Sequence, residues 1–221
     1  MKIPTPEFLS AQFFMRNEPV EGLDDLPRIA PSQVHGSEIL HVNVENFARY
    51  VLPLRPEADG VLLTTSRVGA SLRFADCAPV LLWGKSWVMI LHSGYKGTTL
   101  NISASGVEVV RELFGTDAVS DARAWVGPCI GKEHYCRDLA DEWTQKGITS
   151  FHAENFSEKA GKIFFGLAGE IHSQLVDAGL SDENITLSGI DTYIDEECYS
   201  YRRGDKTDRM TLHVYIKKGS I

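Results

Sequence analysis

The sequence contains no apolar run long enough to cross a membrane and no excess of positive charge. Its longest apolar runs, such as Val88 to Leu91, fall far short of the roughly 20 residues that a bilayer requires. Acidic residues outnumber basic ones by 30 to 22, which gives a net charge of −8. Duplex nucleic acids and anionic membrane surfaces both bind basic faces, so we expect neither as a partner. The N-terminus has no apolar signal segment, and we therefore expect a cytoplasmic protein.

Common metal-binding motifs are also missing. The four cysteines form no Cys-x-x-Cys pair and no regular framework, so we expect free thiols. The seven histidines form no His-x-His pair, no HExxH motif and no His-x-Glu motif with a downstream Cys-x-x-Cys. These absences exclude the usual zinc-protease and zinc-deaminase signatures. They also exclude a true multicopper laccase, whose copper centres are ligated mostly by His-x-His pairs.

The hydrophobic pattern predicts an α+β fold. The 221 residues, 43% of them hydrophobic, suffice for a full core, and no repeat or linker interrupts them, so we expect one domain over 1–221. Strands are predicted over 61–65, 68–74, 79–83, 87–92, 122–127, 185–190 and 210–216. Helices are predicted over 98–114, 137–146 and 158–178, each followed by a glycine, the last with Ser157 as N-cap. Hairpins first and helices later favour sheet packed under helices.

Three residues stand at the ends of predicted strands in polar surroundings. His35 lies in the polar segment QVHG, which enters a further predicted strand, Cys77 lies in ADCAP between two apolar strands, and His92 ends an apolar run before a glycine-rich turn. Such positions are typical of the rim of a sheet, where sites are usually built, although each residue alone fits an ordinary core or surface role. Their surroundings make these three residues candidates for a site, and imidazole and thiolate groups are ligands that a divalent metal can take.

Asp76 precedes the candidate cysteine directly. On a regular strand, adjacent side chains point to opposite faces. We therefore expect Asp76 to brace its loop or to orient a neighbouring group, and not to bind the metal.

Two basic segments could hold an anion. Lys96 lies in the turn GYKG, which runs into a predicted helix, and backbone N–H groups at a helix start favour anions. Arg202 and Arg203 form a pair that suits bidentate recognition of phosphate or carboxylate. The alternative interpretation is a glycine turn and a loop whose basic side chains are merely solvated.

Six segments, taken in order, resemble the YfiH/laccase-domain family, whose members are described as polyphenol oxidoreductases and as purine nucleoside phosphorylases. The segments are 33–36 (QVHG), 58–60 (ADG), 75–79 (ADCAP), 92–97 (HSGYKG), 127–131 (GPCIG) and 200–203 (SYRR). The resemblance implies mixed β-sheets packed between helical layers. It also implies a zinc ion bound by His35, Cys77 and His92, which would be the catalytic residues.

The same resemblance implies a purine nucleoside and phosphate as substrates. The family's activities are phosphorolysis of adenosine, inosine, guanosine and methylthioadenosine, together with adenosine deamination. Some members also act in editing of peptidoglycan precursors. On this basis we expect the substrate-binding residues to be Gln33, Asp76, Lys96, Arg202 and Arg203.

The sequence departs from the family pattern in three places. Tyr95 and Lys96 stand where the family has Trp and Arg, and the motif after GPCIG reads EHYC over 133–136. The N-terminal segment 1–32 is shorter than in the family. Arg16 corresponds to the arginine of the family's FTTR stretch, but the glycine-rich segment and helix that should follow are missing. These departures bear on substrate preference.

Three other functions compete with the zinc enzyme. A metal-free amidohydrolase or deamidase would use Cys77 as nucleophile and His92 as base. A copper-binding polyphenol oxidase would need an axial methionine, and Met89 is three residues from His92 on one strand, so it points to the other face. Met15 or Met210 would then have to serve. A non-catalytic metal-binding protein would hold the ion without turnover.

Overall fold

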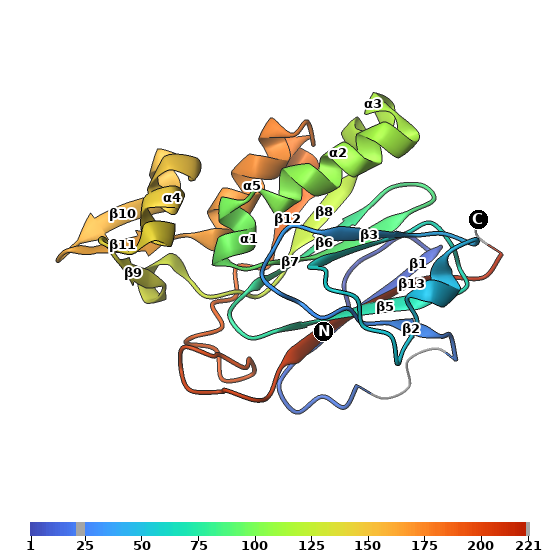
Figure 1. The fold of residues 1–221 in the computed structure, drawn as a ribbon, viewed down its shortest axis with the longest axis horizontal. Helices are drawn as coiled ribbons and strands as arrows, with labels where there is room; N and C mark the ends of the chain where they lie inside the picture. Colours follow the sequence, from blue (N-terminus) through green and yellow to red (C-terminus); the bar gives the residue numbers. More distant parts are fainter. Residues whose placement is uncertain (21–24, 220–221) are drawn as a thin grey trace.

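The computed structural model describes residues 1–20 and 25–219. Its centre is a six-stranded mixed sheet in the order β12-β8-β6-β7-β4-β3 (Figure 1). In that order the strands are Ile185–Leu187, Arg123–Val126, Ala78–Trp83, Val88–Ser93, Gly60–Leu63 and Ile39–Val42. The four inner strands pair antiparallel, and both outer strands join parallel to their neighbours.

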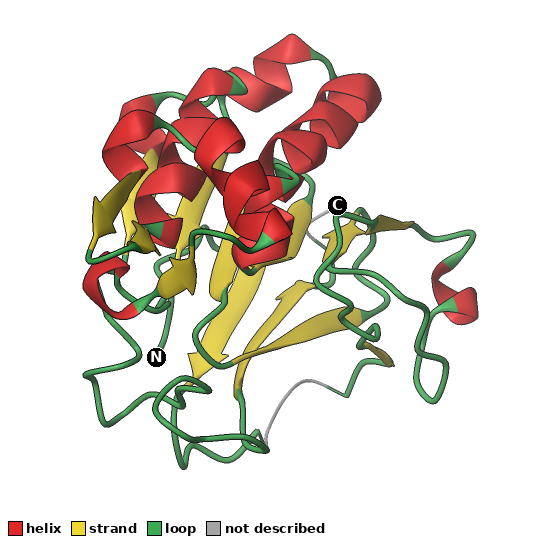
Figure 2. Ribbon diagram, turned by 60° about the vertical axis from the view of Figure 1, so that its left-hand side comes forward, coloured by secondary structure: helices red, strands yellow, loops and turns green. Residues whose placement is uncertain are grey.

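A second sheet and a layer of helices cover the two faces of this central sheet (Figure 2). The second sheet has the order β1-β13-β5-β2, with the strands Leu9–Phe14, Met210–Ile216, Gly69–Phe74 and Arg28–Ile29. The helices are α1 (Tyr95–Thr99), α2 (Ile102–Phe114), α3 (Thr116–Ser120) and α5 (Leu167–Asp177), and they lie on the opposite face (Figure 1). The predicted α+β class and mixed sheets are thus confirmed. The expected packing of sheets between helical layers differs, because these four helices form a single layer on one face of the central sheet.

Alternation along the central strands explains why they are apolar throughout. In β7, Met89 and Leu91 join the core under the helices, while Val88 and Ile90 join the core between the two sheets. A strand that is buried on both faces reads as a continuous apolar run. His92 continues the second set, and its ring lies 5.5 Å from that of Phe74 in β5. The end of β7 therefore directs an imidazole toward the space between the sheets.

A small third sheet extends the molecule beside α1 (Figure 1). Its order is β10-β11-β9, with the strands Phe156–Lys159, Lys162–Phe165 and Cys136–Asp138. Helix α4 (Glu142–Ser150) belongs to the same part of the chain, and its N-cap Asp141 accepts a hydrogen bond from the N–H of Thr144. The described residues also form short 3₁₀ turns at 47–49, 132–134, 153–155 and 182–184.

The predicted helix over 158–178 is wrong in its first half. Ala160 and Gly161 adopt positive φ angles of 52° and 72°, and they form the turn of a hairpin between β10 and β11. The helix begins only at Leu167, so Ser157 lies in a strand and is not an N-cap. The four-residue spacing of Ile163 and Leu167 resembles one face of a helix, but Ile163 lies in strand β11 and Leu167 in helix α5. Both side chains are apolar because they pack into the same core.

Two other predicted helices need correction. Asn101, with φ at 58°, ends α1 and caps α2, so 98–114 is two helices and not one. Residues 136–138 form β9, so the helix predicted over 137–146 begins at Glu142 and runs on to Ser150. The predicted strands all have counterparts among the observed ones. Within the described residues, no helix combines the length and apolarity needed to cross a membrane.

Candidate metal and substrate site

Three separate segments bring His35, Cys77 and His92 together. Strands β6 and β7 pair so that Ala78 lies opposite Ser93 and Pro79 opposite His92, which places Cys77 beside the end of β7. His35 comes from the loop before β3, and its ring centroid lies 4.9 Å from that of His92. One ligand atom from each of the three residues lies within 4.8 Å of the others. The structure thus brings together the three residues that the sequence predicts as ligands.

Asp59 holds two of these residues in place. Its carboxylate accepts hydrogen bonds from the N–H groups of Val34, His35 and Gly36, at 3.1, 3.1 and 2.7 Å. It also accepts one from Nδ1 of His92 at 2.7 Å. Burial alone would raise the pKa of Asp59, but the hydrogen bonds from His92 and the loop outweigh it and lower that pKa. Because an ionised carboxylate can only accept, His92 carries a proton on Nδ1 and turns Nε2 toward the site.

The electrostatics of the site favour a thiolate. Burial would raise the pKa of Cys77, but the charge of His92 and hydrogen bonds with both histidines lower it. Burial would conversely lower the pKa of His92, but the charge of Cys77 and the hydrogen bond to Asp59 raise it. Without a metal, these opposed shifts favour a thiolate on Cys77 and a positive charge on His92. A thiolate is the form in which cysteine both ligates a metal and acts as a nucleophile.

Gly94 leaves the space that these ligands need. A Cβ at this position would lie 2.6 Å from Sγ of Cys77 and 3.4 Å from Cδ2 of His35. Real Cβ atoms do not approach a sulfur so closely, so any side chain here would displace the thiol. The first glycine of the HSGYKG segment is thus explained by the close approach of its backbone to the thiol of Cys77.

The three residues fit a divalent metal. Zinc binds imidazole nitrogen at about 2.0–2.1 Å and thiolate sulfur at about 2.3 Å, so ligand atoms around one ion lie roughly 3.5 Å apart. Ligand atoms that already lie within 4.8 Å of one another need only small side-chain rotations to reach this arrangement. A thiolate with two imidazoles suits zinc or copper in ligand softness. Among the described residues, this is the one group of three or more His, Cys, Asp or Glu that could hold an ion.

Asp76 takes a bracing position. Its backbone has a φ of 81°. Its side chain accepts hydrogen bonds from Oγ1 of Thr192 at 2.9 Å and from the N–H of Arg202 at 2.7 Å. It therefore ties the loop that follows β12 to the segment carrying Cys77.

A cavity of about 730 Å³ opens over these residues. Gln33, Asp76, Lys96 and Arg202 line it together with the three candidate ligands, so it brings together most of the expected substrate-binding residues. Several of its residues were not singled out from the sequence, namely Arg55, Arg73, Tyr135, Arg137 and Arg209. Arg55, Arg73 and Arg209 come from distant segments and have no motif around them. Tyr135 lies in the EHYC segment, which Arg137 follows, and Asp59 lies in the ADG segment, so these could have been found from the sequence.

Arg203 and Arg16 are occupied elsewhere. The guanidinium of Arg203 donates to the carbonyl oxygens of Thr192, Tyr193, Asp195 and Cys198, and Arg203 is not among the lining residues of the cavity. Arg16 pairs with Asp205 at 2.7 Å and lies over the ring of Tyr199. Both arginines hold the loop that ends at β13, and the structure gives no support to a substrate-binding role for Arg203.

Fold and site together define an α+β protein with an open site of two histidines and one cysteine. Residues 20–217 match the family described as multi-copper polyphenol oxidoreductase laccase, and the chain belongs to this laccase-like family. The family resemblance found in the sequence is therefore confirmed.

Relatives of this chain are named as purine nucleoside phosphorylases and not as laccases. The chain is 30% identical over 160 residues to a protein of Aquifex aeolicus named purine nucleoside phosphorylase, covering 72% of this chain and 71% of the relative. It is 32% identical over 166 residues to the purine nucleoside phosphorylase YlmD of Bacillus subtilis, covering 72% of this chain and 59% of the relative. The chain thus spans less than two thirds of the Bacillus protein.

Solved structures agree with the fold. The chain superposes on YfiH of Bacillus licheniformis with a TM-score of 0.76 at 28% identity, covering 86% of this chain and 74% of that one. It superposes on a Neisseria meningitidis protein with a TM-score of 0.79 at 18% identity, covering 98% and 97% of the two chains. The second likeness concerns the fold alone.

Proposed function

We propose that this protein is a zinc-dependent purine nucleoside phosphorylase. It would cleave the N-glycosidic bond of adenosine, inosine, guanosine and methylthioadenosine with inorganic phosphate. The observation that carries the proposal is the combination of an open His₂Cys site with a cavity whose lining is strongly basic. The names of the relatives from Aquifex and Bacillus support the choice of substrate.

The basic lining suits a phosphate dianion. Among the described residues, six Lys or Arg side chains line the cavity and Asp76 is its one acid, although the whole chain has a net charge of −8. Lys96 is the first candidate for the phosphate. Its ammonium lies over the ring of Trp143, 4.9 Å from the centroid, and no carboxylate of the described residues lies within ion-pair distance. Helix α1 has only five residues, so the charge of Lys96 and not the helix end supports this assignment.

Tyr135 is suited to contact the nucleoside. It lines the cavity, and its hydroxyl oxygen accepts a hydrogen bond from Arg137 at 3.4 Å, which leaves its own proton free to donate. Burial raises the pKa of Tyr135, so the hydroxyl stays protonated at neutral pH. A cavity of about 730 Å³ lies in the range of about 300–1,000 Å³ that small-molecule sites occupy. Nucleoside and phosphate would thus bind side by side.

In the proposed reaction an oxygen of phosphate forms a bond to C1′ of the ribose while the bond from C1′ to the purine nitrogen breaks. Lys96 would hold the phosphate, and Tyr135 would donate a hydrogen bond to the nucleoside. Asp59 would keep the rings of His35 and His92 in place. A zinc ion held by His35, Cys77 and His92 would supply a Lewis acid at the reacting end of the cavity. Adenosine deamination would be a separate reaction, in which water attacks C6 of the purine and ammonia leaves, so that adenosine becomes inosine.

A metal-free hydrolase is the second candidate, and one observation favours it. The Cys77 thiolate, His92 and Asp59 form a chain of nucleophile, base and orienting acid, as in cysteine hydrolases.

Copper is the second candidate metal. Met89 is packed against α2, where its sulfur would lie 2.7 Å from a Cβ at Gly106, so it lies on the other face from His92 and gives no axial ligand.

Metal analysis and a phosphorolysis assay on the same preparation test the proposal. The purified protein should contain about one zinc per chain, and it should convert adenosine to adenine and ribose 1-phosphate only when phosphate is present. Cys77→Ala should lose both metal and activity while remaining folded. Cys136→Ala, which removes a thiol that does not line the cavity, should keep both. Full activity after removal of the metal would favour the hydrolase, and metal binding without any turnover would favour a non-catalytic protein.

A further inference from the structure

The basic residues of the cavity lie on two walls. Lys96, Arg137 and Arg202 form the helix-side wall, near α1 and the small third sheet. Arg137 lies over the ring of Tyr95 and Arg202 over that of Tyr135, and these two rings are 5.6 Å apart. The wall is thus one connected group of cations and aromatic rings.

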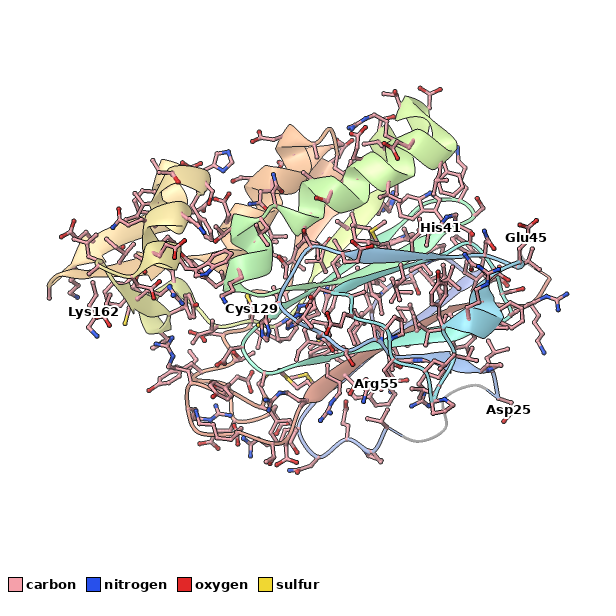
Figure 3. All side chains as sticks on the ribbon, in the orientation of Figure 1. Asp25, His41, Glu45, Arg55, Cys129 and Lys162 are labelled. Atoms are coloured by element: carbon pink, nitrogen blue, oxygen red, sulfur yellow. The ribbon has the colours of Figure 1, made fainter. Side chains whose placement is uncertain are left out.

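Arg55, Arg73 and Arg209 form the sheet-side wall. Arg73 lies in β5, and Arg209 directly precedes β13, whose residues Met210 and Thr211 pair with Phe74 and Arg73. Arg73 and Arg209 are therefore neighbours across two strands. Figure 3 shows Arg55 beside the four-stranded sheet and far from α4, which carries Trp143 under Lys96. The two walls therefore come from different elements of the fold, and they adjoin where Arg209 lies over the ring of Tyr201, the neighbour of Arg202.

The residues of the sheet-side wall are held in position. The side-chain amide of Gln33 both donates to the carbonyl of Arg73 at 2.8 Å and accepts from its N–H at 2.9 Å. Nε of Arg55 donates to the carbonyl of Ala30 at 3.0 Å. The Arg209 guanidinium donates to carbonyl oxygens of its own loop. Gln33, which precedes His35 by two residues, thus links this wall to the metal site.

The three arginines keep their charge available. Within the described part of the chain, no carboxylate lies within ion-pair distance of Arg55, Arg73 or Arg209. Arg16, Arg137 and Arg203 differ in this respect, because each pairs with an aspartate. Among the described residues, two acids line a smaller neighbouring cavity that shares Arg73 and Arg209, and neither forms an ion pair with these arginines. Glu18 accepts from the N-terminus and from the N–H of Met15, and Asp208 accepts from Thr207.

We propose that the sheet-side wall binds a second anionic group, the 5′-phosphate of a purine nucleoside monophosphate. The proposal rests on the proposed function and narrows its substrate class. One phosphate dianion is matched by the helix-side wall. The sheet-side wall presents the guanidinium groups of Arg55 and Arg73, while Arg209 adds a positive charge whose donors are bonded within its own loop. Planar guanidinium groups bind phosphate through paired hydrogen bonds. A nucleotide would place its own phosphate on one wall and the attacking phosphate on the other.

The reaction on such a substrate is balanced without another reagent. An oxygen of inorganic phosphate bonds to C1′, the bond from C1′ to the purine nitrogen breaks, and the purine leaves with one proton. The 5′-phosphate is unchanged. The products are the free purine and ribose 1,5-bisphosphate, and no oxidation or reduction takes place.

Kinetics with adenosine and with adenosine 5′-monophosphate test the proposal. The wild-type protein should have a lower KM for the monophosphate. Arg73→Gln removes an exposed side chain, and it should raise that KM by about 10- to 100-fold, the effect of losing a charge-assisted hydrogen bond. Its KM for adenosine should rise much less, because adenosine has no 5′-phosphate for Arg73 to bind. Arg67→Gln removes the same charge from an exposed turn that does not line the cavity, and should change neither value.

Binding measurements separate this proposal from the proposed function. If neither compound is cleaved, the phosphorylase proposal fails, but calorimetry with the monophosphate, adenosine and ribose 5-phosphate still tests the wall. Tighter binding of the two phosphate compounds that is lost in Arg73→Gln supports it. Equal binding of adenosine and its monophosphate, or an equal loss of both in the variant, overturns it.

Discussion

The carboxylate of Asp59 lies 2.7 Å from Nδ1 of His92 and also accepts the N–H of His35. Asp59 is completely buried. One side chain therefore orients His92, a candidate ligand on β7, and fixes the backbone of His35, a candidate ligand in a loop with a left-handed φ of 60°. Carboxylates in such positions fix the tautomer of a histidine ligand and raise its basicity. The metal affinity of this site should consequently depend on Asp59.

Asp59→Asn should weaken zinc affinity by about 10- to 100-fold, the usual effect of removing a partner behind a metal-binding histidine. An amide has a single acceptor atom, so it cannot serve both His92 and the loop. The measurement is competition with a chelator, with the thermal midpoint as a check on folding. Asp191→Asn is the matched control, because Asp191 accepts from Nδ1 of His134 at 2.6 Å and neither residue lines the cavity. Equal zinc affinity in the two variants would remove Asp59 from its positioning role.

Gly94→Ala should abolish tight metal binding while the fold persists. The added Cβ would meet Sγ of Cys77 at 2.6 Å, so the thiol must move out of reach of the histidines. Gly166→Ala is the control, since its nearest neighbours would lie at an ordinary 3.4 Å. Zinc content after dialysis against a fixed free concentration gives the answer. Retention of a full equivalent in Gly94→Ala would mean that the thiol has room to move.

The strands were predictable because a strand that is buried on both faces forms a continuous apolar run in the sequence. Strands β6 and β7 are apolar at every position that faces either core, and such runs have few other interpretations. The hairpin β10–β11 was not predictable from the same pattern. Ile163 and Phe165 alternate over too few residues to be told from one face of a helix, and the turn at Ala160 contains no Asn-Gly or Asp-Gly signal.

The candidate ligands were predictable, but their surroundings were not. His35, Cys77 and His92 each end or precede a predicted strand, so their convergence at one rim could be expected. Arg73 and Arg209 meet across strands whose pairing joins residues far apart in the sequence. Arg203, in contrast, is a residue of the type that binds phosphate. Its guanidinium N–H groups, however, donate to the carbonyl oxygens of a tight loop.

His152 should make stability depend on pH at a distance from the cavity. Its Nδ1 lies 3.2 Å from the buried carboxylate of Glu170 and its Nε2 lies 3.0 Å from Asp177. The hydrogen bond to Glu170 raises the pKa of His152 above its usual value of about 6.5. A raised folded-state pKa contributes stability that is complete below the unfolded-state pKa and disappears as the pH rises through the folded-state pKa.

The difference in unfolding free energy between the wild type and His152→Gln should therefore be largest near pH 5.5 and should shrink toward pH 8. Urea unfolding at several pH values measures it. In a Glu170→Gln background the same difference should vary much less, because the partner charge is gone. A difference that stays constant or grows with pH would show that the pair does not stabilise the charged imidazole.

Lys96→Met should raise the phosphate concentration required for half-maximal adenine release by about 10- to 100-fold. Losing a charge-assisted hydrogen bond costs about 1.5–3 kcal/mol, and about 1.4 kcal/mol corresponds to a factor of ten. Methionine keeps the length of the side chain, so its packing on Trp143 should survive. Lys85→Met is the control, because Lys85 is exposed and pairs with Asp121 away from the cavity. Adenine release and inosine formation should be followed separately at several phosphate concentrations. Deamination uses water and no phosphate, so its rate should fall much less than phosphorolysis. If both activities fall equally, Lys96 shapes the cavity in general and the phosphate must be held by another residue of the helix-side wall.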